Sequence, residues 1–338
     1  MKIVIPGGSG QVGSILARAF LVGGHEVVVL SREPCCAPWR VVRWDGVTVE
    51  DCWAKDIDGC DVVINLAGHS VDCRYNERNR RLIMDSRVQS TRVIGKAIAA
   101  AVRPPAIWLQ SSTATMYSHR YDAANDEATG ILGGVEDDVP DTWRFSIDVA
   151  VAWEQAVREA DTPNTRKVLL RSAMTMSPDR GGVFDMLLRL VRCGLGGTSG
   201  DGKQYVSWIH DSDFVRAVNW LIAHDEIQGA VNLASPNPLP NAEFMRGLRR
   251  AWGIWIGLPA TEWMLKIGTF LLRTESELVL KSRRVVPGCL EESGFKFEFA
   301  DWNSAAQDLC FRWREASADA VRTLPSAASD RKSLPVAQ

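Results

Sequence analysis

The N-terminal half of the chain alternates between short apolar runs and longer stretches with apolar residues at helical spacing. Lys2–Ile5 is a short apolar run, and apolar residues between positions 15 and 22 return at the spacing of one helix face. Gly23-Gly24 then fits a helix C-cap, and Glu26–Leu30 is a second run rich in β-branched residues. This opening predicts a strand, a glycine-rich loop, a helix and a second strand.

The same alternation continues to about residue 174. Further strands are expected at Val41–Trp44, Asp61–Leu66, Ala106–Ser112 and Lys167–Arg171, and helices at Asn76–Val102 and Thr142–Ala160. Strands that alternate with helices of this length are typical of βαβ units. We therefore predict an α/β fold: a Rossmann-type doubly wound parallel sheet with a smaller C-terminal α+β lobe. Right-handed crossovers bring the loops that follow the strands to one edge of such a sheet.

Beyond residue 174 shorter elements are separated by loops rich in glycine and proline. Helices are expected at Asp211–His224, Thr261–Leu272 and Ser276–Arg283, and the alternating phenylalanines of Phe295–Phe299 indicate a one-sided strand. The expected domains are a nucleotide-binding domain (residues 1–230, of which 175–210 contribute to a substrate lobe), a small C-terminal domain (231–312) and a disordered tail (323–338).

Composition narrows the classes of function. The 338 residues include 39 Lys+Arg and 41 Asp+Glu, and the net charge of -2 argues against a general binder of nucleic acid or anionic membranes. No apolar run reaches the roughly 18 residues of a membrane helix, and the start lacks the pattern of a secretory signal, so we expect a cytoplasmic protein. The eight cysteines and five histidines lack metal-site spacings, so we expect free thiols and no metal.

Three glycines mark a nucleotide site. Gly7, Gly10 and Gly13 lie directly between the first strand and the first helix. In this context glycine allows a tight turn, close approach of the backbone to a pyrophosphate, and close packing of helix on strand, while the helix N-terminus faces the phosphates. We therefore expect a bound dinucleotide.

The end of the second strand distinguishes between the two dinucleotides. NAD binders usually place an acid here for the ribose 2′-hydroxyl, whereas this chain has Ser31-Arg32, followed by Glu33. An acid repels a 2′-phosphate, but a guanidinium and a hydroxyl bind one. This favours NADP (NADPH) over NAD, with a solvated surface arginine as the alternative interpretation of Arg32.

The chain resembles the extended short-chain dehydrogenase/reductase superfamily, and within it the atypical "epimerase family" that carries a small C-terminal domain of unknown function. The matching segments lie in the family's order over nearly all of residues 1–310: Pro6–Gly13, Val42–Asp45, Asp61–Gly68, Asp85–Val88, Ser207–His210, Asn232–Phe244 and Ser293–Phe297.

The resemblance implies a set of cofactor contacts. They are Gly7, Gly8, Ser9, Gly10, Gln11, Val12 and Gly13 in the loop, together with Ser31, Arg32, Leu66, Ala67, Arg87 and Thr175. Strand-end packing is an alternative interpretation of Leu66 and Ala67. For Arg87 the alternative is an ion pair on the helix surface with Asp85 or a nearby acid.

The superfamily's chemistry normally uses a Ser or Thr after the fifth strand and a Tyr-x-x-x-Lys pair on the next helix. The lysine lowers the pKa of the tyrosine, which passes a proton as a hydride moves to or from the nicotinamide. Thr113 matches the hydroxyl position, with Ser112 next, but Ser146 and Ala150 stand where the tyrosine and the lysine belong. This chain therefore lacks the usual pair.

Two other residues are candidates for the proton transfer that the missing Tyr-Lys pair would perform. The resemblance places Tyr117 near the nicotinamide, and the ordinary pKa of His210 suits proton transfer. A helix-start packing role, with Asp211 as the N-cap, is the alternative for His210. We expect Glu154 and Asp148 to be solvated or capping residues.

The sequence identifies residues that could contact a substrate less clearly than those that contact the cofactor. Gly194–Gly202 resembles the family's glycine-rich loop, which could close over a ligand with Lys203, Gln204 and Trp208 as contacts. Superfamily members often form homodimers, which the resemblance leaves open here.

Two hypotheses from different classes follow. The first is an NADP(H)-dependent oxidoreductase or epimerase acting on a small metabolite, with Thr113, Tyr117 and His210 around the reacting oxygen. The second is a non-catalytic NADP(H)-binding redox sensor or regulatory protein, favoured by an intact cofactor loop beside a missing Tyr-Lys pair.

Overall fold

A seven-stranded parallel sheet forms the centre of the computed structural model, which describes residues 1–134, 136, 139–259 and 281–322. The strand order is β10-β6-β5-β4-β1-β2-β3. The strands are β1 (Lys2–Pro6), β2 (Glu26–Ser31), β3 (Arg40–Arg43), β4 (Val62–Asn65), β5 (Ile107–Thr113), β6 (Arg166–Ser172) and β10 (Gly229–Leu233). All six neighbouring pairs are parallel. The predicted Rossmann-type architecture is confirmed.

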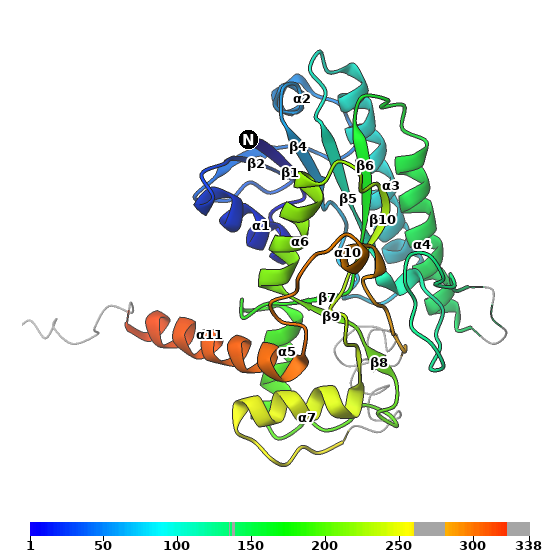
Figure 1. Cartoon of the computed structure of the whole chain (residues 1–338). Helices are drawn as coiled ribbons and strands as arrows, with labels where there is room; N and C mark the ends of the chain where they lie inside the picture. The colour runs from blue at the N-terminus through cyan, green and yellow to red at the C-terminus, as the bar shows by residue number, and fades with distance from the viewer. Residues whose placement is uncertain (135, 137–138, 260–280, 323–338) are drawn as a thin grey trace, which may run out of the picture.

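Helices cover both faces of this sheet (Figure 1). One face packs against α1 (Gln11–Val22) and α6 (Asp211–Ala223), and the other against α2 (Asp51–Ile57), α3 (Glu77–Ala100) and α4 (Asp141–Arg158). In β1, Ile3 and Ile5 enter the first core and Val4 enters the second. Strands buried on both faces are apolar at every position, which is why the runs were readable in the sequence.

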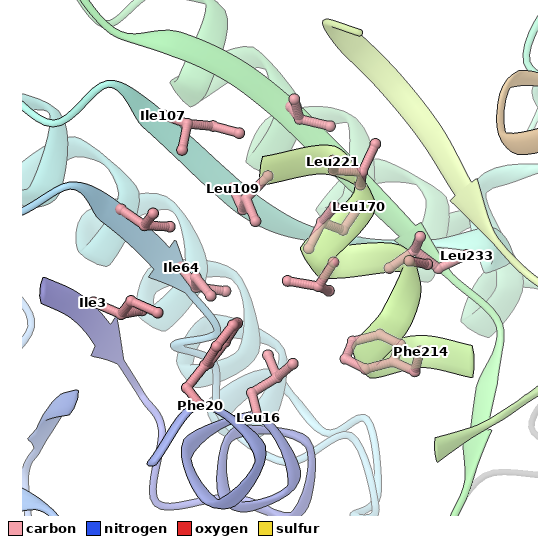
Figure 2. Packing of buried hydrophobic residues seen from close by; sticks show 14 of the residues in the cluster. Ile3, Leu16, Phe20, Ile64, Ile107, Leu109, Leu170, Phe214, Leu221 and Leu233 are labelled. Carbon is pink, nitrogen blue, oxygen red and sulfur yellow. The ribbon is translucent and has the colours of Figure 1, made fainter. Parts of the chain in front are cut away.

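Figure 2 shows the core on the α1–α6 side. Phe20 and Leu16 from α1 and Phe214 and Leu221 from α6 meet the strand residues there, and all four are at most 1% exposed. This packing fixes α1 against β1, and therefore also fixes the glycine loop between them.

A second lobe lies beyond the carboxyl ends of the strands (Figure 1). It contains two small sheets, β7 (Met174–Met176) with β9 (Trp208–His210) and β8 (Tyr205–Val206) with β11 (Leu239–Pro240). Its helices are α5 (Val183–Arg192), α7 (Asn241–Trp252) and α11 (Trp302–Arg322), packed around Trp208, Phe244 and Trp302. The short helix α10 (Gly288–Glu292) lies between the lobe and the sheet in Figure 1, and the 3-10 helix η1 (Ala114–Met116) directly follows β5.

The predicted strand at Phe295–Phe299 is wrong. This segment is irregular, because the amides of Glu298 and Phe299 donate to the carboxylate of Asp213 rather than to a neighbouring strand. Phe295 is buried in the core of the first sheet face, and the Phe299 ring stacks on His210. The three phenylalanines therefore serve different contacts.

Several other predicted segments lie wholly or partly outside the residues that the structure describes. The predicted helix at Thr261–Leu272 and the tail from residue 323 lie outside the described residues, and residues 281–283 of the second late helix are irregular. The expected domain boundary after residue 230 falls inside β10. No helix in the described ranges combines the length and apolarity that crossing a membrane requires.

Candidate functional site

The β1–α1 loop has the geometry of a phosphate cradle. Gly7 has φ +74°, and a Cβ there would lie 2.5 Å from the Ala67 backbone, at the point where β1 and β4 diverge. A Cβ on Gly13 would lie 2.3 Å from the Cα of Gly8, so α1 touches the loop directly. A Cβ on Gly10 would meet only one atom, at 3.9 Å. The loop is closed on two sides and open at Gly10, where a pyrophosphate would approach.

The amides at the start of α1 lack a protein acceptor of the usual kind. Gly10 is the N-cap and supplies no side-chain oxygen, and the first turn contains no acid. Nearby, the Gln11 Nε2 atom is buried without a hydrogen-bond partner. It lies against Gly182, the N-cap of α5. An anion at this position would satisfy both sets of donors.

His69, which follows β4, lies within reach of the charges of Arg32, which follows β2, and of Arg87 in α3. Burial first, and then the charges of Arg32 and Arg87, lower the pKa of His69. Ser31 is buried, and its hydroxyl bonds the Ser9 hydroxyl at 3.2 Å, which links this corner to the glycine loop. The positive potential is located where a 2′-phosphate would lie beside Ser31.

The contacts of Arg87 differ from the ion pair that its alternative interpretation predicts. Its guanidinium donates to the carbonyl of His69 at 3.0 Å and lies 5.0 Å from the centre of the Trp153 ring. Burial lowers the pKa of Arg87 to about 10, and no carboxylate in the described part of the chain forms an ion pair with it. The helix-surface ion pair with Asp85 is therefore wrong.

Leu66 and Ala67 directly follow β4, and Thr175 lies in the strand that follows β6. Leu66 donates its amide to the carbonyl of Pro6, and Ala67 donates to the side chain of Asn65. Thr175 lies in β7 and is 8% exposed.

Thr113 ends β5. Its hydroxyl accepts the amide of Thr115 at 3.1 Å and so caps η1. On α4, the side chain of Ser146 donates to the carbonyl of Thr142, and Ala150 is fully buried. Thr113 is thus a half-exposed polar side chain at this strand end, and neither α4 position offers a phenol or an amine.

Tyr117 lies inside a buried polar network, which the sequence did not indicate. Its hydroxyl contacts the Asn232 side-chain oxygen at 2.9 Å and an Arg171 nitrogen at 2.9 Å. The residue is 2% exposed, and burial raises the pKa of its phenol. The Tyr117 hydroxyl is therefore buried and engaged: it joins Arg171 of β6 to Asn232 of β10 from the loop after β5.

The prediction that Glu154 is a solvated or capping residue is also wrong. Instead of being solvated, it is 1% exposed and pairs with Arg171 through two oxygens, at 2.9 and 3.0 Å. It also accepts the Ser112 hydroxyl at 2.7 Å and bonds Arg158 at the helix surface. Burial raises the pKa of this carboxyl, but the hydrogen bonds and charge of Arg171 outweigh that effect, so the pKa is lowered overall.

His210 itself, not Asp211, is the N-cap of α6. Its Nδ1 accepts the Ser212 amide at 3.1 Å, which leaves Nε2 as the donor to Asp308 at 3.0 Å. The ring is 1% exposed, and burial lowers its pKa despite the flanking carboxylates. With both nitrogens engaged, His210 is a structural cap rather than an open acid or base.

The three expected substrate residues do not face a common ligand. Trp208 is fully buried edge-on against Trp302, so its placement in a pocket is wrong. Gln204 is 3% exposed and donates to the Ser199 carbonyl, which pins the preceding glycine loop, while Lys203 is exposed. The Gln204 carbonyl also receives the first amide of α7. These hydrogen bonds of Gln204 hold the glycine-rich loop in place, so the structure gives no support to its closing over a ligand.

Sequence reasoning missed His69, Arg171 and Asn232. His69 could have been found, because it follows the Leu66-Ala67 segment at the point where the strand order reverses. Arg171 and Asn232 lie inside strand runs and gave no local signal, since their partners are far away in sequence.

Known proteins resemble this chain over most of its length. Residues 3–234 match the model of the NAD dependent epimerase/dehydratase family, and residues 260–309 match a domain of unknown function named DUF1731. Epimerase family protein SDR39U1 of Homo sapiens is 29% identical over 91% of this chain and 99% of its own length. An epimerase family protein of Mycobacterium tuberculosis is 32% identical over 87% of this chain and 93% of its own.

A solved structure extends the likeness. The crystal structure of human SDR39U1 isoform 2 with NADPH has a TM-score of 0.79 to this chain at 26% identity, covering 92% of this chain and 99% of that one. A nucleoside-diphosphate sugar epimerase of Corynebacterium glutamicum has a TM-score of 0.70 at 26% identity, covering 94% of this chain and 61% of its own.

Proposed function

Because this chain belongs to the NAD dependent epimerase/dehydratase family, we propose that it binds NADP(H) and uses it in an oxidoreductase or epimerase reaction on a small metabolite. The observation that carries the proposal is the β1–α1 loop, closed at Gly7 and Gly13 and open at Gly10, together with the positive charges of Arg32 and Arg87 around His69. The human relative that was crystallised with NADPH supports the choice of cofactor.

Each part of the site has a separate task toward the dinucleotide. The amides from Gly8 to Gly13, with Ser9, Gln11 and Val12 in the same loop, hold the pyrophosphate. Ser31 and Arg32 bind the 2′-phosphate, and Arg87 adds positive charge beside it, whereas the lowered pKa of His69 keeps that ring neutral. Leu66 and Ala67 contact the adenine ribose, and Thr175 supports the nicotinamide end.

The reaction centre is simpler than the superfamily's usual arrangement. The bound cofactor supplies or accepts a hydride at its nicotinamide ring. Thr113 orients the reacting oxygen of the substrate: its oxygen accepts the Thr115 amide, which leaves its proton available for donation. Tyr117 and His210 keep the strand ends and α6 in place. Lys203 is the loop residue retained as a substrate contact, because its side chain is exposed.

A second candidate function is a non-catalytic NADP(H)-binding sensor or regulator. The observation that favours it concerns the usual Tyr-Lys positions: Ser146 and Ala150 stand there, and the Tyr117 hydroxyl is engaged in a buried network.

Calorimetry tests cofactor binding. We expect NADPH to bind more tightly than NADH, and Arg32→Ser to weaken NADPH about 10- to 100-fold, because a hydrogen bond to a charged group contributes roughly 1.5–3 kcal/mol. NADH affinity should change little. Arg92→Ser, an exposed arginine on α3, serves as the matched control. Absence of binding heat for either nucleotide contradicts the proposal.

A label experiment separates the two candidate functions. The protein is incubated with 4-deuterated NADPH and a cell metabolite extract, and the extract is searched for deuterated products. Stereospecific transfer of the label supports the oxidoreductase. Tight NADPH binding without loss of label supports the sensor.

A further inference from the structure

An exposed apolar patch lies on the lobe, around the C-terminal end of α5 and the segment after α7. It consists of Leu190, Leu195, Trp255, Ile256 and Leu258, whose exposed fractions are 44%, 51%, 82%, 79% and 61%. On α5, Met186 and Val183 extend it along one helix face, at 49% and 38% exposure. Single exposed apolar residues are ordinary, but a contiguous set with a tryptophan marks an interaction surface.

Backbone hydrogen bonds join the two halves of this patch. The Leu258 amide donates to the Gly194 carbonyl at 2.8 Å, and the Gly197 amide donates to the Leu258 carbonyl at 3.2 Å. The Leu195 amide donates to the Leu190 carbonyl at 2.9 Å. The segment after α7 is therefore held beside the end of α5. In Figure 1 the chain after α7 forms the edge of the molecule farthest from the large sheet.

Three arginines of α7 adjoin the patch. Arg249 donates to the Gly196 carbonyl at 2.7 Å, and its aliphatic stem lies against Gly257. Burial lowers the pKa of Arg249, and the charges of Arg246 and Arg250 lower it further, so the three cations act on one another. Within the described part of the chain none of them forms an ion pair, although α7 contains one acid, Glu243.

We propose that this surface, the apolar patch with Arg246, Arg249 and Arg250, docks the protein on an anionic lipid membrane. Trp255 and Ile256 would enter the boundary between head groups and acyl chains, and the arginines would face the lipid phosphates. Arginine stems reach charged groups while their methylenes stay in apolar surroundings. The whole-chain charge of -2 hides this local imbalance. The proposal is independent of the cofactor.

Charge decides between a membrane and a second copy of the chain. In a symmetric dimer through this patch, the same three arginines of both subunits would be brought to one interface and would repel each other. An anionic membrane offers opposite charge over the whole surface. Such contact requires no spanning helix, since the apolar residues enter only the outer layer of the bilayer.

The test is co-flotation of the full chain with vesicles of phosphatidylcholine that contain a minority of phosphatidylglycerol, compared with vesicles of phosphatidylcholine alone. We expect flotation with the anionic vesicles and a steep loss at high salt, because salt screens the arginines. Arg246→Gln/Arg250→Gln should weaken binding about fivefold for each arginine, since a basic residue near an anionic surface contributes about 1 kcal/mol. Trp255→Ser/Ile256→Ser should abolish flotation.

Matched controls keep the test specific. Val22→Ser/Val102→Ser removes two apolar side chains that are 85% and 86% exposed elsewhere, and Arg78→Gln/Arg144→Gln removes two exposed arginines on α3 and α4. Both controls should float like the wild type, and all variants should melt alike. Three results would overturn the proposal: no flotation of the wild type, equal loss in a control, or self-association that Trp255→Ser/Ile256→Ser abolishes while vesicles are ignored.

Discussion

Three glycines of the β1–α1 loop meet three different physical demands. Gly7 needs the left-handed region of φ, Gly13 needs to carry no Cβ so that α1 can approach the loop, and Gly10 leaves open space in front of the helix. Because all three demands act within a few residues of chain, the sequence motif was sufficient to predict them.

The roles of Gly13 and Gly10 can be separated by substitution. Gly13→Ala should destabilise the fold by about 1–3 kcal/mol, because its Cβ would overlap Gly8. Gly10→Ala should cost less than about 1 kcal/mol, the difference between glycine and alanine at an N-cap, yet weaken NADPH binding. Thermal denaturation and calorimetry measure the two effects. Unchanged NADPH affinity in Gly10→Ala would show that the pyrophosphate does not pass over this residue.

At the scale of elements, strands and long helices were predictable, and their polar connections were not. The ends of β4, β5, β6, α3 and α4 lie within two residues of their expected bounds. In contrast, Glu154 was expected in solvent and Phe295–Phe299 in a strand. Both errors have the same cause. The spacing of apolar residues along the sequence indicates which face of an element is buried, but it does not indicate which distant group will form a hydrogen bond with a polar side chain or a backbone amide.

The Glu154–Arg171 pair ties α4 to β6 beneath the β5 end, and its removal tests that role. Arg171→Met should lower the free energy of unfolding by about 3–5 kcal/mol, because the carboxylate would remain buried without its main partner. Arg158→Met, which removes the half-exposed partner of the same carboxylate, should cost at most about 1 kcal/mol. Urea denaturation at neutral pH measures both variants. Equal losses would mean that Arg171 is not the principal partner.

At the scale of the whole molecule, α11 closes the lobe against the start of α6. Arg312 bonds Asp211 through both terminal nitrogens, at 2.8 and 2.7 Å, and Asp308 holds the ring of His210. The C-terminal helix therefore reaches back to the element that covers the first face of the sheet. The core of the lobe contains residues from both sides of residue 230, among them Trp208 and Trp302.

The contact between α11 and the start of α6 should make the stability of the fold depend on pH. The folded state keeps His210 neutral with a pKa below the ordinary value of 6.5, so the unfolded chain takes up the proton first as pH falls. Stability should be full above about pH 7 and decline toward about pH 5. His210→Asn retains an N-cap acceptor but cannot titrate in this range, so its stability should depend less on pH. Melting temperatures of both proteins across this range provide the measurement, and parallel curves would contradict the assignment.

The sequence by itself determined the order of strands and helices, the glycine loop and the arginine at the end of β2, because each of these is written in neighbouring residues. Only the tertiary structure decided what the polar side chains do. The Tyr117 hydroxyl meets Asn232 across 115 residues of chain, and His210 meets Asp308 across 98. Such pairings depend on how the elements pack, and packing places side chains together that no local pattern relates.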